Sequence, residues 1–416
     1  MTSNQKESGV SDHDRVRGCV GSAYPFLTAR TADAPEERPA PDSVLAADPQ
    51  SAAEPGDDDV FPFYLDLLAE IDALGLDDVG LVPVADAQVF DVFAERARSG
   101  ACAGMTYLTD NIEARRSPRS VLPDAQTIVV VALSERRLRD ESRETTEAIF
   151  SAPELQHADD APALTATVSG YAACVDYHDA LRKRLKGLSR FLASRFPGAS
   201  TRAVVDTAPL LEKYWATVAG LGFVGLNTLT ISPRLGSRFF LGEVLVSTPM
   251  SELCGCSTTE EYLRLRERVG KARGEAPFDV RDASKRCLTC RRCVNACPTN
   301  ALVGDRTLDA RRCLNYWTIE NRDEIPEDIG KLLGGRLFGC DLCQRVCPHN
   351  AGIETADPRE LPLDAVERLD EETFRRLFRK TPIFRARVEG LKRVAHTLRE
   401  TESGKSESGG AANANS

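Results

Sequence analysis

Apolar residues switch between helical and strand-like spacing along the chain from about residue 61 to residue 250. The helical spacing predicts amphipathic helices over 64–74, 87–99, 177–195 and 209–219. Short apolar runs predict strands over 79–84, 127–133, 201–205, 228–231 and 239–246. The run at 127–133 is apolar throughout, which is typical of a strand buried on both faces. The alternation of helices and strands predicts an α/β domain over 61–250.

The rest of the chain divides by composition. Residues 1–60 and 402–416 are rich in small and polar residues with little apolar periodicity, which predicts a disordered extension and a disordered tail. Residues 251–283 are polar and charged, and we expect a linker or an insertion there. A cysteine-rich, ferredoxin-like α+β module is predicted at 284–350, followed by a short helical C-terminal segment at 351–401.

Composition limits the class of protein. The chain has 416 residues, of which 42% are hydrophobic and 28% charged, which is typical of a globular protein with two or three domains. It contains no run of about eighteen apolar residues, so we expect no membrane partner. The net charge of -10 argues against a protein held on nucleic acid by bulk charge, although a local basic surface stays open. The first residues lack the apolar segment of an export signal, so we expect free thiols and a cytoplasmic location.

Eight of the thirteen cysteines form two linked arrays. The first array is Cys-x2-Cys-x2-Cys-x3-Cys-Pro, in which the fourth cysteine of a bacterial ferredoxin binds the other cluster. Its members are Cys287, Cys290, Cys293 and Cys297. The second array lacks a first cysteine at that spacing, and Cys313 is the candidate that completes it. Its other members are Cys340, Cys343 and Cys347.

These eight thiolates fill two 4Fe-4S clusters with none spare. We assign one cluster to Cys287, Cys290, Cys293 and Cys347, and the other to Cys297, Cys313, Cys340 and Cys343. Zinc sites favour separate Cys-x2-Cys pairs, and disulfides require an oxidising compartment, so both alternatives fit this spacing less well. Cys254 and Cys256 form a Cys-Gly-Cys motif in a charged segment, and we favour an incidental role for them.

Two stretches between the predicted strands are candidates for chemistry. Asp206 ends an apolar strand and precedes Pro209, which places its carboxyl group at a strand end where open sheets bind ligands. An ordinary helix-capping role is the alternative for this aspartate. Gly220, Gly222 and Gly225 have the spacing of a dinucleotide fingerprint but follow a helix instead of a strand. They fit either a large cofactor lying against the backbone or a set of tight turns.

Several ordered motifs of the chain resemble those of the epoxyqueuosine reductases, which are cobalamin and iron-sulfur enzymes of tRNA modification. The resemblance runs from about residue 91 to residue 393. Besides the Asp206 stretch, the glycines and both cysteine arrays, it includes Gly-Met-Thr-Tyr-Leu at 104–108, Ser-Pro-Arg-Ser-Val-Leu-Pro at 117–123, Gly-Tyr-Ala at 170–172, Asp-Tyr-His at 176–178, Arg-Cys-Leu-Asn-Tyr at 312–316 and Thr-Ile-Glu at 318–320.

The resemblance implies a function. The α/β domain would bind base-off cobalamin, the two clusters would pass it electrons, and epoxyqueuosine at the wobble position of a tRNA would be reduced to queuosine. Asp206 matches the family's proton donor. The implied cobalamin contacts are Asp206, Tyr177, Asn227, Thr230, Ser237, Leu241, Gly242 and Asn315. The implied substrate contacts are Asp176, His178 and Lys213. The expected partners are the modified tRNA and a low-potential electron donor such as flavodoxin or ferredoxin, and the chain is expected to act as a monomer.

The chain departs from the family pattern in its recognition motifs. Leu226 and Lys213 stand where the family has Lys and Arg, and no Arg occurs between Ala172 and Asp176. A small-molecule reductase similar to the reductive dehalogenases and a ferredoxin-type electron carrier are therefore the competing interpretations. An unperturbed aspartic acid, with a pKa of about 3.9, is ionised at neutral pH. We therefore expect the site to raise the pKa of Asp206 if it donates a proton.

Overall fold

The computed structural model describes residues 62–158, 164–276 and 279–410. The predicted extension at 1–60 and the last part of the predicted tail, 411–416, lie outside these described residues. Within them, none of the twelve cysteines forms a disulfide. A search of the same residues for a helix with the length and apolar character of a membrane span finds none.

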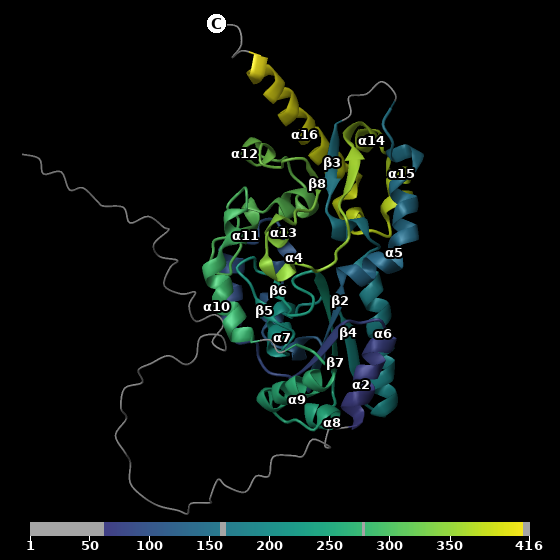
Figure 1. Cartoon of the computed structure of the whole chain (residues 1–416), viewed down its shortest axis with the longest axis vertical. Coiled ribbons are helices and arrows are strands. Elements are labelled where there is room, and N and C mark those ends of the chain that lie inside the picture. Colours follow the sequence, from purple (N-terminus) through teal and green to yellow (C-terminus); the bar gives the residue numbers. More distant parts are fainter. Residues whose placement is uncertain (1–61, 159–163, 277–278, 411–416) are drawn as a thin grey trace, which may run out of the picture.

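A four-stranded sheet lies at the centre of the N-terminal half of the molecule (Figure 1). In spatial order its strands are β1 (Asp78–Pro83), β2 (Thr127–Ser134), β7 (Phe239–Val246) and β4 (Thr201–Val204). Every strand is close to its predicted position, and all eight residues of β2 are buried, as predicted. All three strand pairs are antiparallel. The predicted alternation of helices and strands is therefore built on an antiparallel sheet, a strand direction that hydrophobic spacing does not encode.

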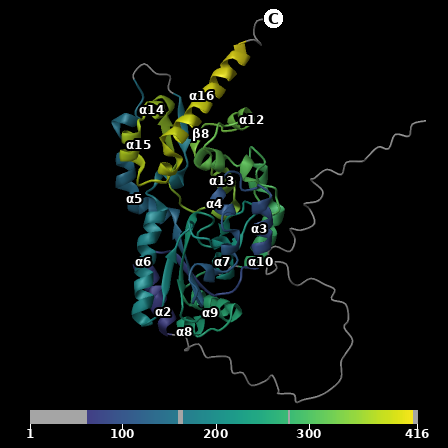
Figure 2. The same cartoon turned by 180° about the vertical axis from the view of Figure 1, so that it is seen from behind.

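Helices cover both faces of this sheet (Figures 1 and 2). One face packs against α2 (Pro62–Ala73), α6 (Tyr177–Arg195), α8 (Met250–Cys254) and α9 (Thr259–Ala272). The other face packs against α3 (Phe90–Arg98) and α7 (Glu212–Val218). Because side chains alternate along a strand, Val244 points toward α6, whereas Glu243 points to the face that α7 covers.

A second sheet joins segments that are distant in the sequence. Its strands are, in spatial order, β8 (Arg336–Phe338), β3 (Thr165–Val168) and β9 (Arg359–Pro362). The helices packed in the same hydrophobic core are α5 (Glu135–Phe150), α14 (Leu363–Arg368), α15 (Glu371–Phe378) and α16 (Arg387–Gly410). The region 61–250 thus contributes β3 to a sheet whose other strands follow residue 335. Helix α16 also continues beyond residue 401, where the predicted helical segment ended.

The cysteine-rich module is built from short elements. They are α10 (Val280–Cys290), α11 (Arg292–Asn295), α12 (Glu327–Gly330) and α13 (Leu342–Arg345). The hairpin of β5 (Phe223–Val224) and β6 (Thr230–Ile231) packs against this module from the N-terminal half. This hairpin is the glycine-rich stretch, and Gly222 approaches the Ile231 carbonyl so closely that a Cβ there would lie 2.1 Å from it. The glycine at 222 therefore serves a tight hairpin.

Other predictions about elements need correction. The helix expected from 209 begins at Glu212, because the preceding residues form a turn in which the Leu210 amide donates to the Ala208 carbonyl. Helices α5 and α9 were not predicted. In the expected linker at 251–283, α9 starts with a capping box at Thr258 and buries Tyr262, Leu265 and Val269. The segment was not recognised as a helix because most of its residues are charged and only these three apolar residues form its buried stripe.

Candidate active site

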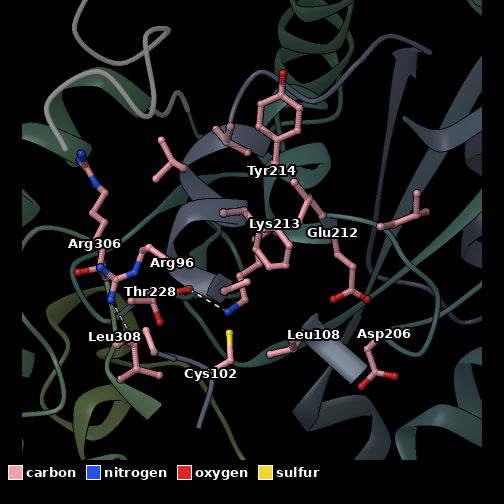
Figure 3. A pocket seen from close by; sticks show the side chains of 18 of the residues that line it. Arg96, Cys102, Leu108, Asp206, Glu212, Lys213, Tyr214, Thr228, Arg306 and Leu308 are labelled. Atoms are coloured by element: carbon pink, nitrogen blue, oxygen red, sulfur yellow. Dashed lines mark hydrogen bonds between the residues drawn. The ribbon is translucent and has the colours of Figure 1, made fainter. Parts of the chain in front are cut away.

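Two cavities meet at Asp206, Glu212 and Lys213, which line both of them. The larger, of about 730 Å³, lies between α3, α7 and the short helix α4 (Thr106–Thr109) (Figure 3). The smaller, of about 320 Å³, lies between the start of β7 and Asn315 and Cys340 of the cysteine-rich module. Together they form a crevice that leads from the cysteines to the N-terminal half of the molecule.

The Asp206 carboxylate is held by the first turn of α6. Asp176 caps this helix by accepting the His178 amide at 2.9 Å, and its carboxylate also lies 2.6 Å from His178 Nδ1. His178 Nε2 lies 2.8 and 3.0 Å from the two carboxylate oxygens of Asp206. The Tyr177 hydroxyl donates to Asp206 at 2.8 Å, and its ring stacks on Phe240 at 4.2 Å. The helix start therefore carries an aspartate, a histidine and a tyrosine that fix Asp206.

The proton of this group resides on His178. A neutral imidazole donates from one nitrogen only, whereas both nitrogens here face a carboxylate, so the arrangement selects the doubly protonated form. Burial lowers the pKa of His178, but the hydrogen bonds and charges of Asp176 and Asp206 outweigh it and raise the pKa to about 9. Burial raises the pKa of Asp206, but the hydrogen bond and charge of His178 outweigh it, so the net pKa is lowered. The expected rise at Asp206 is therefore wrong for this structure, because a cation neighbours the carboxylate.

Glu212 and Lys213 begin α7 and point to opposite sides of the larger cavity (Figure 3). Burial and the charge of Asp206 raise the pKa of Glu212 to about 8. Lys213 is exposed to the crevice, and the protein atoms crowded around it lower its pKa. Its amino group donates to the Thr228 carbonyl at 3.0 Å. Thr228 has a left-handed φ of 65° in the turn of the β5–β6 hairpin, which directs this carbonyl toward the cavity.

Four of the predicted cluster ligands line one further cavity of about 360 Å³. They are Cys287, Cys290, Cys293 and Cys347. The Leu226 amide also donates to Cys287 Sγ at 3.4 Å, a contact that stabilises a thiolate or a bound sulfur. The grouping has the size and donor set for a 4Fe-4S cluster. Within the described ranges, no three His, Cys, Asp or Glu side chains are grouped closely enough to hold a single metal ion.

The other four predicted ligands are also neighbours. After burial, the charges of Cys340, Cys313 and Cys297 raise the pKa of Cys343, and Cys340 and Cys297 raise that of Cys313. The Ala301 amide donates to Cys297 Sγ at 3.3 Å. Thiols that oppose one another's ionisation in this way are the donor set that a cationic iron-sulfur core satisfies. Cys293 also raises the pKa of Cys343, so the two sets adjoin.

The structure brings most of the predicted cofactor contacts to the smaller cavity. Besides Asp206 and Tyr177, its lining includes Thr230, Ser237, Leu241 and Asn315. Asn227 instead lines the cavity of the first cysteine set. Gly242 lines none of the three cavities described here, and a Cβ at this position would lie 2.9 Å from Leu185 of α6. Its lack of a side chain therefore serves helix packing on the opposite face of the sheet.

Several residues of the crevice were not predicted. Arg385 and Tyr107 line the larger cavity, and the Arg385 guanidinium lies 5.6 Å from the centre of the Tyr107 ring. No spacing in the sequence relates these two positions. Glu212 lies in the Asp206 stretch but carried no signal of its own. Glu243 could have been found, because it is the one charged residue in the otherwise apolar strand 239–246.

Comparisons with known proteins identify families and relatives to which this chain is similar. Residues 115–207 match the family described as Epoxyqueuosine reductase QueG, DUF1730, and residues 286–350 match the family described as 4Fe-4S double cluster binding domain. The chain is similar to the epoxyqueuosine reductase of Gloeobacter violaceus, with 35% identity over 344 residues that cover 78% of this chain and 92% of the relative. It is also similar to that of Pseudomonas aeruginosa, with 35% identity over 280 residues, 67% of this chain and 66% of the relative.

Solved structures with the same fold include the epoxyqueuosine reductase from Streptococcus thermophilus, with a TM-score of 0.61, 25% identity, and coverage of 81% of this chain and 80% of that one. Another is an epoxyqueuosine reductase with a tRNA-Tyr epoxyqueuosine-modified tRNA stem loop, with a TM-score of 0.62, 24% identity and 81% of each chain covered. The prediction of a module with two 4Fe-4S clusters is confirmed by the family match at residues 286–350.

Proposed function

Since the chain belongs to the epoxyqueuosine reductase family and is therefore an oxidoreductase, we propose that it reduces epoxyqueuosine at the wobble position of a tRNA to queuosine. The observation that carries this proposal is the Asp206–His178 pair, which holds a proton where the two cavities meet. One cavity leads to the cysteine sets and the other can accept a nucleoside. Such a tRNA would be met in the cytoplasm, where we expect the chain to work.

Electrons would enter through the two clusters. We assign the first cluster to the four cysteines around the 360 Å³ cavity and the second to the set that includes Cys340, which lines the crevice. The first set includes the exposed Cys290 and so faces solvent, where a low-potential donor such as flavodoxin or ferredoxin can approach. The second set adjoins both the first set and the crevice. These positions imply that electrons would pass from the donor to the first cluster, then to the second cluster, and from there to the crevice.

The smaller cavity fits a cobalamin contact surface. Thr230 Oγ1 is buried there without a hydrogen-bond partner among the described residues, so it can serve a bound amide or phosphate. Ser237, Leu241, Asn315 and Tyr177 would form the rest of this surface. Cobalamin, when bound, supplies a low-potential reducing centre.

The chain's own residues would deliver the protons. Loss of the epoxide oxygen as water consumes two electrons and two protons, and the oxygen must be protonated as its bonds to carbon break. His178 carries a proton at neutral pH and hydrogen-bonds Asp206 through Nε2 at 3.0 Å. Asp206, which faces the crevice, would pass it to the epoxide oxygen. Asp176 and Tyr177 hold this pair in position, so we assign Asp176 and His178 to the proton path instead of direct substrate contact.

The larger cavity carries cations that could contact a tRNA. Its lining holds four cations, Arg96, Arg306, Arg385 and Lys213, against the three acids Asp206, Glu212 and Asp305, whereas the whole chain has a net charge of -10. A local group of cations beside the active site attracts phosphates even when the net charge is negative. Lys213 supplies the charge that an Arg supplies in the family, with a single amino group instead of a fork.

The test is a single-turnover assay with the reconstituted protein, cobalamin, a chemical reductant and tRNA that carries epoxyqueuosine. We expect loss of one oxygen from the nucleoside, measured by mass spectrometry after digestion of the tRNA. Unmodified tRNA and protein without reductant are the controls. Full retention of epoxyqueuosine with both clusters and cobalamin in place would refute the proposed function.

A further inference from the structure

Glu243 is a carboxylate in the middle of a protein core. It lies on the inner strand β7, with Val130 of β2 and Val204 of β4 as its neighbours across the sheet. Its exposed fraction is 0%, and neither carboxylate oxygen has a hydrogen-bond partner among the described residues. An ionised carboxylate without a partner is very costly at such a place, so a group like this binds a proton instead.

Glu243 lies behind the wall of the crevice. It lines neither of the two cavities that meet at Asp206, whereas Glu212 lines both. A bound molecule in the crevice therefore meets Glu212 and not Glu243. Glu212 Oε1 is also buried without a partner in the described part of the chain. The two glutamates thus lie one behind the other, from the sheet to the crevice.

The charges around this pair oppose its ionisation. Burial, followed by the charges of Glu212 and Asp206, raises the pKa of Glu243 well above its ordinary value. Burial and the charge of Asp206 raise the pKa of Glu212 to about 8, although the cations Lys213, His178 and Arg115 act in the opposite direction. Each of these cations is hydrogen-bonded to another group. Lys213 donates to the Thr228 carbonyl, His178 to the carboxylates of Asp176 and Asp206, and Arg115 to the Tyr107 carbonyl at 3.0 Å.

We propose that Glu212 and Glu243 form a buried proton store that supplies the second proton of the reduction. This inference rests on the proposed function. The epoxide takes up two electrons from the low-potential donor, both carbon–oxygen bonds of the ring oxygen break, a carbon–carbon double bond forms, and the oxygen leaves as water with two protons. The Asp206–His178 pair gives the first proton. Glu212 gives the second through Asp206, and Glu243 then returns a proton to Glu212.

The roles of the two glutamates differ. Glu212 faces the crevice and is a direct proton donor to Asp206, which neighbours it (Figure 3). Glu243 acts only through Glu212 and is a positioning residue. Two carboxyl groups that share a site lose their last proton at a higher pH than either would alone, because the doubly ionised state is disfavoured. The store therefore stays filled at the pH where a lone, exposed glutamate is empty.

The first test needs no activity. Glu243→Gln keeps the shape and removes the acid, so infrared spectra of the cluster-loaded wild type at pH 7 should contain one protonated-carboxyl band more than this variant. The pH dependence of the free energy of unfolding gives the direction of the pKa shift. A carboxyl group with a raised pKa stabilises the fold least at high pH, so Glu243→Gln should gain stability relative to wild type as pH rises from 5 to 8.

A matched control is Asp78→Asn. Asp78 is a buried carboxylate too, but Arg266 and Arg234 pair with it at 2.8 and 2.9 Å. Its replacement removes the carboxylate that pairs with Arg266 and should lower stability at pH 8, the opposite sign to Glu243→Gln, while Arg234 keeps its pair with Glu275 at 2.7 Å. If Glu243→Gln does not fold, Glu212→Gln at the crevice wall provides the same infrared comparison.

The second test is the pH profile of single turnover. Wild-type turnover should fall as pH rises past about 8, where Glu212 loses its proton. Glu243→Gln should move this fall to lower pH, and Glu212→Gln should slow turnover by ~100-fold, the low end for general acid catalysis. An unchanged carboxyl band or an unchanged pH profile in Glu243→Gln would overturn the proton store. An inactive wild type that still shows the band would refute the proposed function alone.

Discussion

Replacement of Asp206 by Asn tests the assignment of the proton donor. Asn has nearly the same shape and keeps a hydrogen bond to Tyr177 or His178, but it cannot carry the proton. If Asp206 passes a proton to the departing epoxide oxygen, turnover should fall by at least ~100-fold, the low end for general acid catalysis. The cluster content should stay unchanged, because Asp206 is separate from the cysteine sets, and the cobalamin content should stay unchanged because Asn keeps the shape of the Asp206 side chain in the smaller cavity.

The structure also predicts how His178 responds. The rise of its pKa from 6.5 to about 9 corresponds to about 3 kcal/mol of net stabilisation of the imidazolium. The two carboxylates produce this rise against the opposing effect of burial, so the loss of Asp206 should lower the pKa of His178 by at least ~1 pH unit. Nuclear magnetic resonance titration of the His178 ring in the Asp206→Asn variant measures this change directly.

Asp176→Asn is the matched control. It removes the other carboxylate of His178 and should lower the histidine pKa by a similar amount, while Asn still caps α6. Turnover should fall much less than in Asp206→Asn, because Asp206 still faces the crevice. Near wild-type turnover in Asp206→Asn, with clusters and cobalamin retained, would refute Asp206 as the proton donor and leave it a positioning role.

Three further expectations concern the cofactors and the fold. Anaerobic reconstitution should load about eight iron atoms per chain, and Cys293→Ala should lose about half of them whereas Cys102→Ala keeps them all, by iron and sulfide assays. Thr230→Val removes the unpartnered hydroxyl of the smaller cavity and should weaken cobalamin binding by ~10-fold in an absorbance titration. It should not lower the stability of the cofactor-free chain. Equal cobalamin affinity in the variant and the wild type would show that Thr230 is not part of the cobalamin site. His178→Gln should lose a stabilising contribution that the wild type has in full below pH 6.5 and loses as pH rises through about 9, measured by denaturant unfolding at several pH values.

The cysteine arrays show how much local sequence can determine. Thiolates with two or three residues between them are held near one another by the chain itself. Their spacing alone therefore predicted the two-cluster module that the family match confirms. The strands were also predictable, because each buried face imposes its own spacing of apolar residues. Strand 127–133 is apolar throughout and buried throughout.

The active site depends on contacts that the sequence does not encode locally. His178 and Asp206 are 28 positions apart, and Arg385 reaches the same crevice from near the C-terminus. The direction of the pKa shift of Asp206 was predicted wrongly, because the sequence shows the carboxylate but not the imidazolium beside it. Glu243 was visible as a lone charge in an apolar strand, yet its role depends on Glu212, which α7 brings over that face of the sheet. Such pairs are decided by tertiary packing, because a charge responds to every group within a few ångströms, whatever its position in the chain.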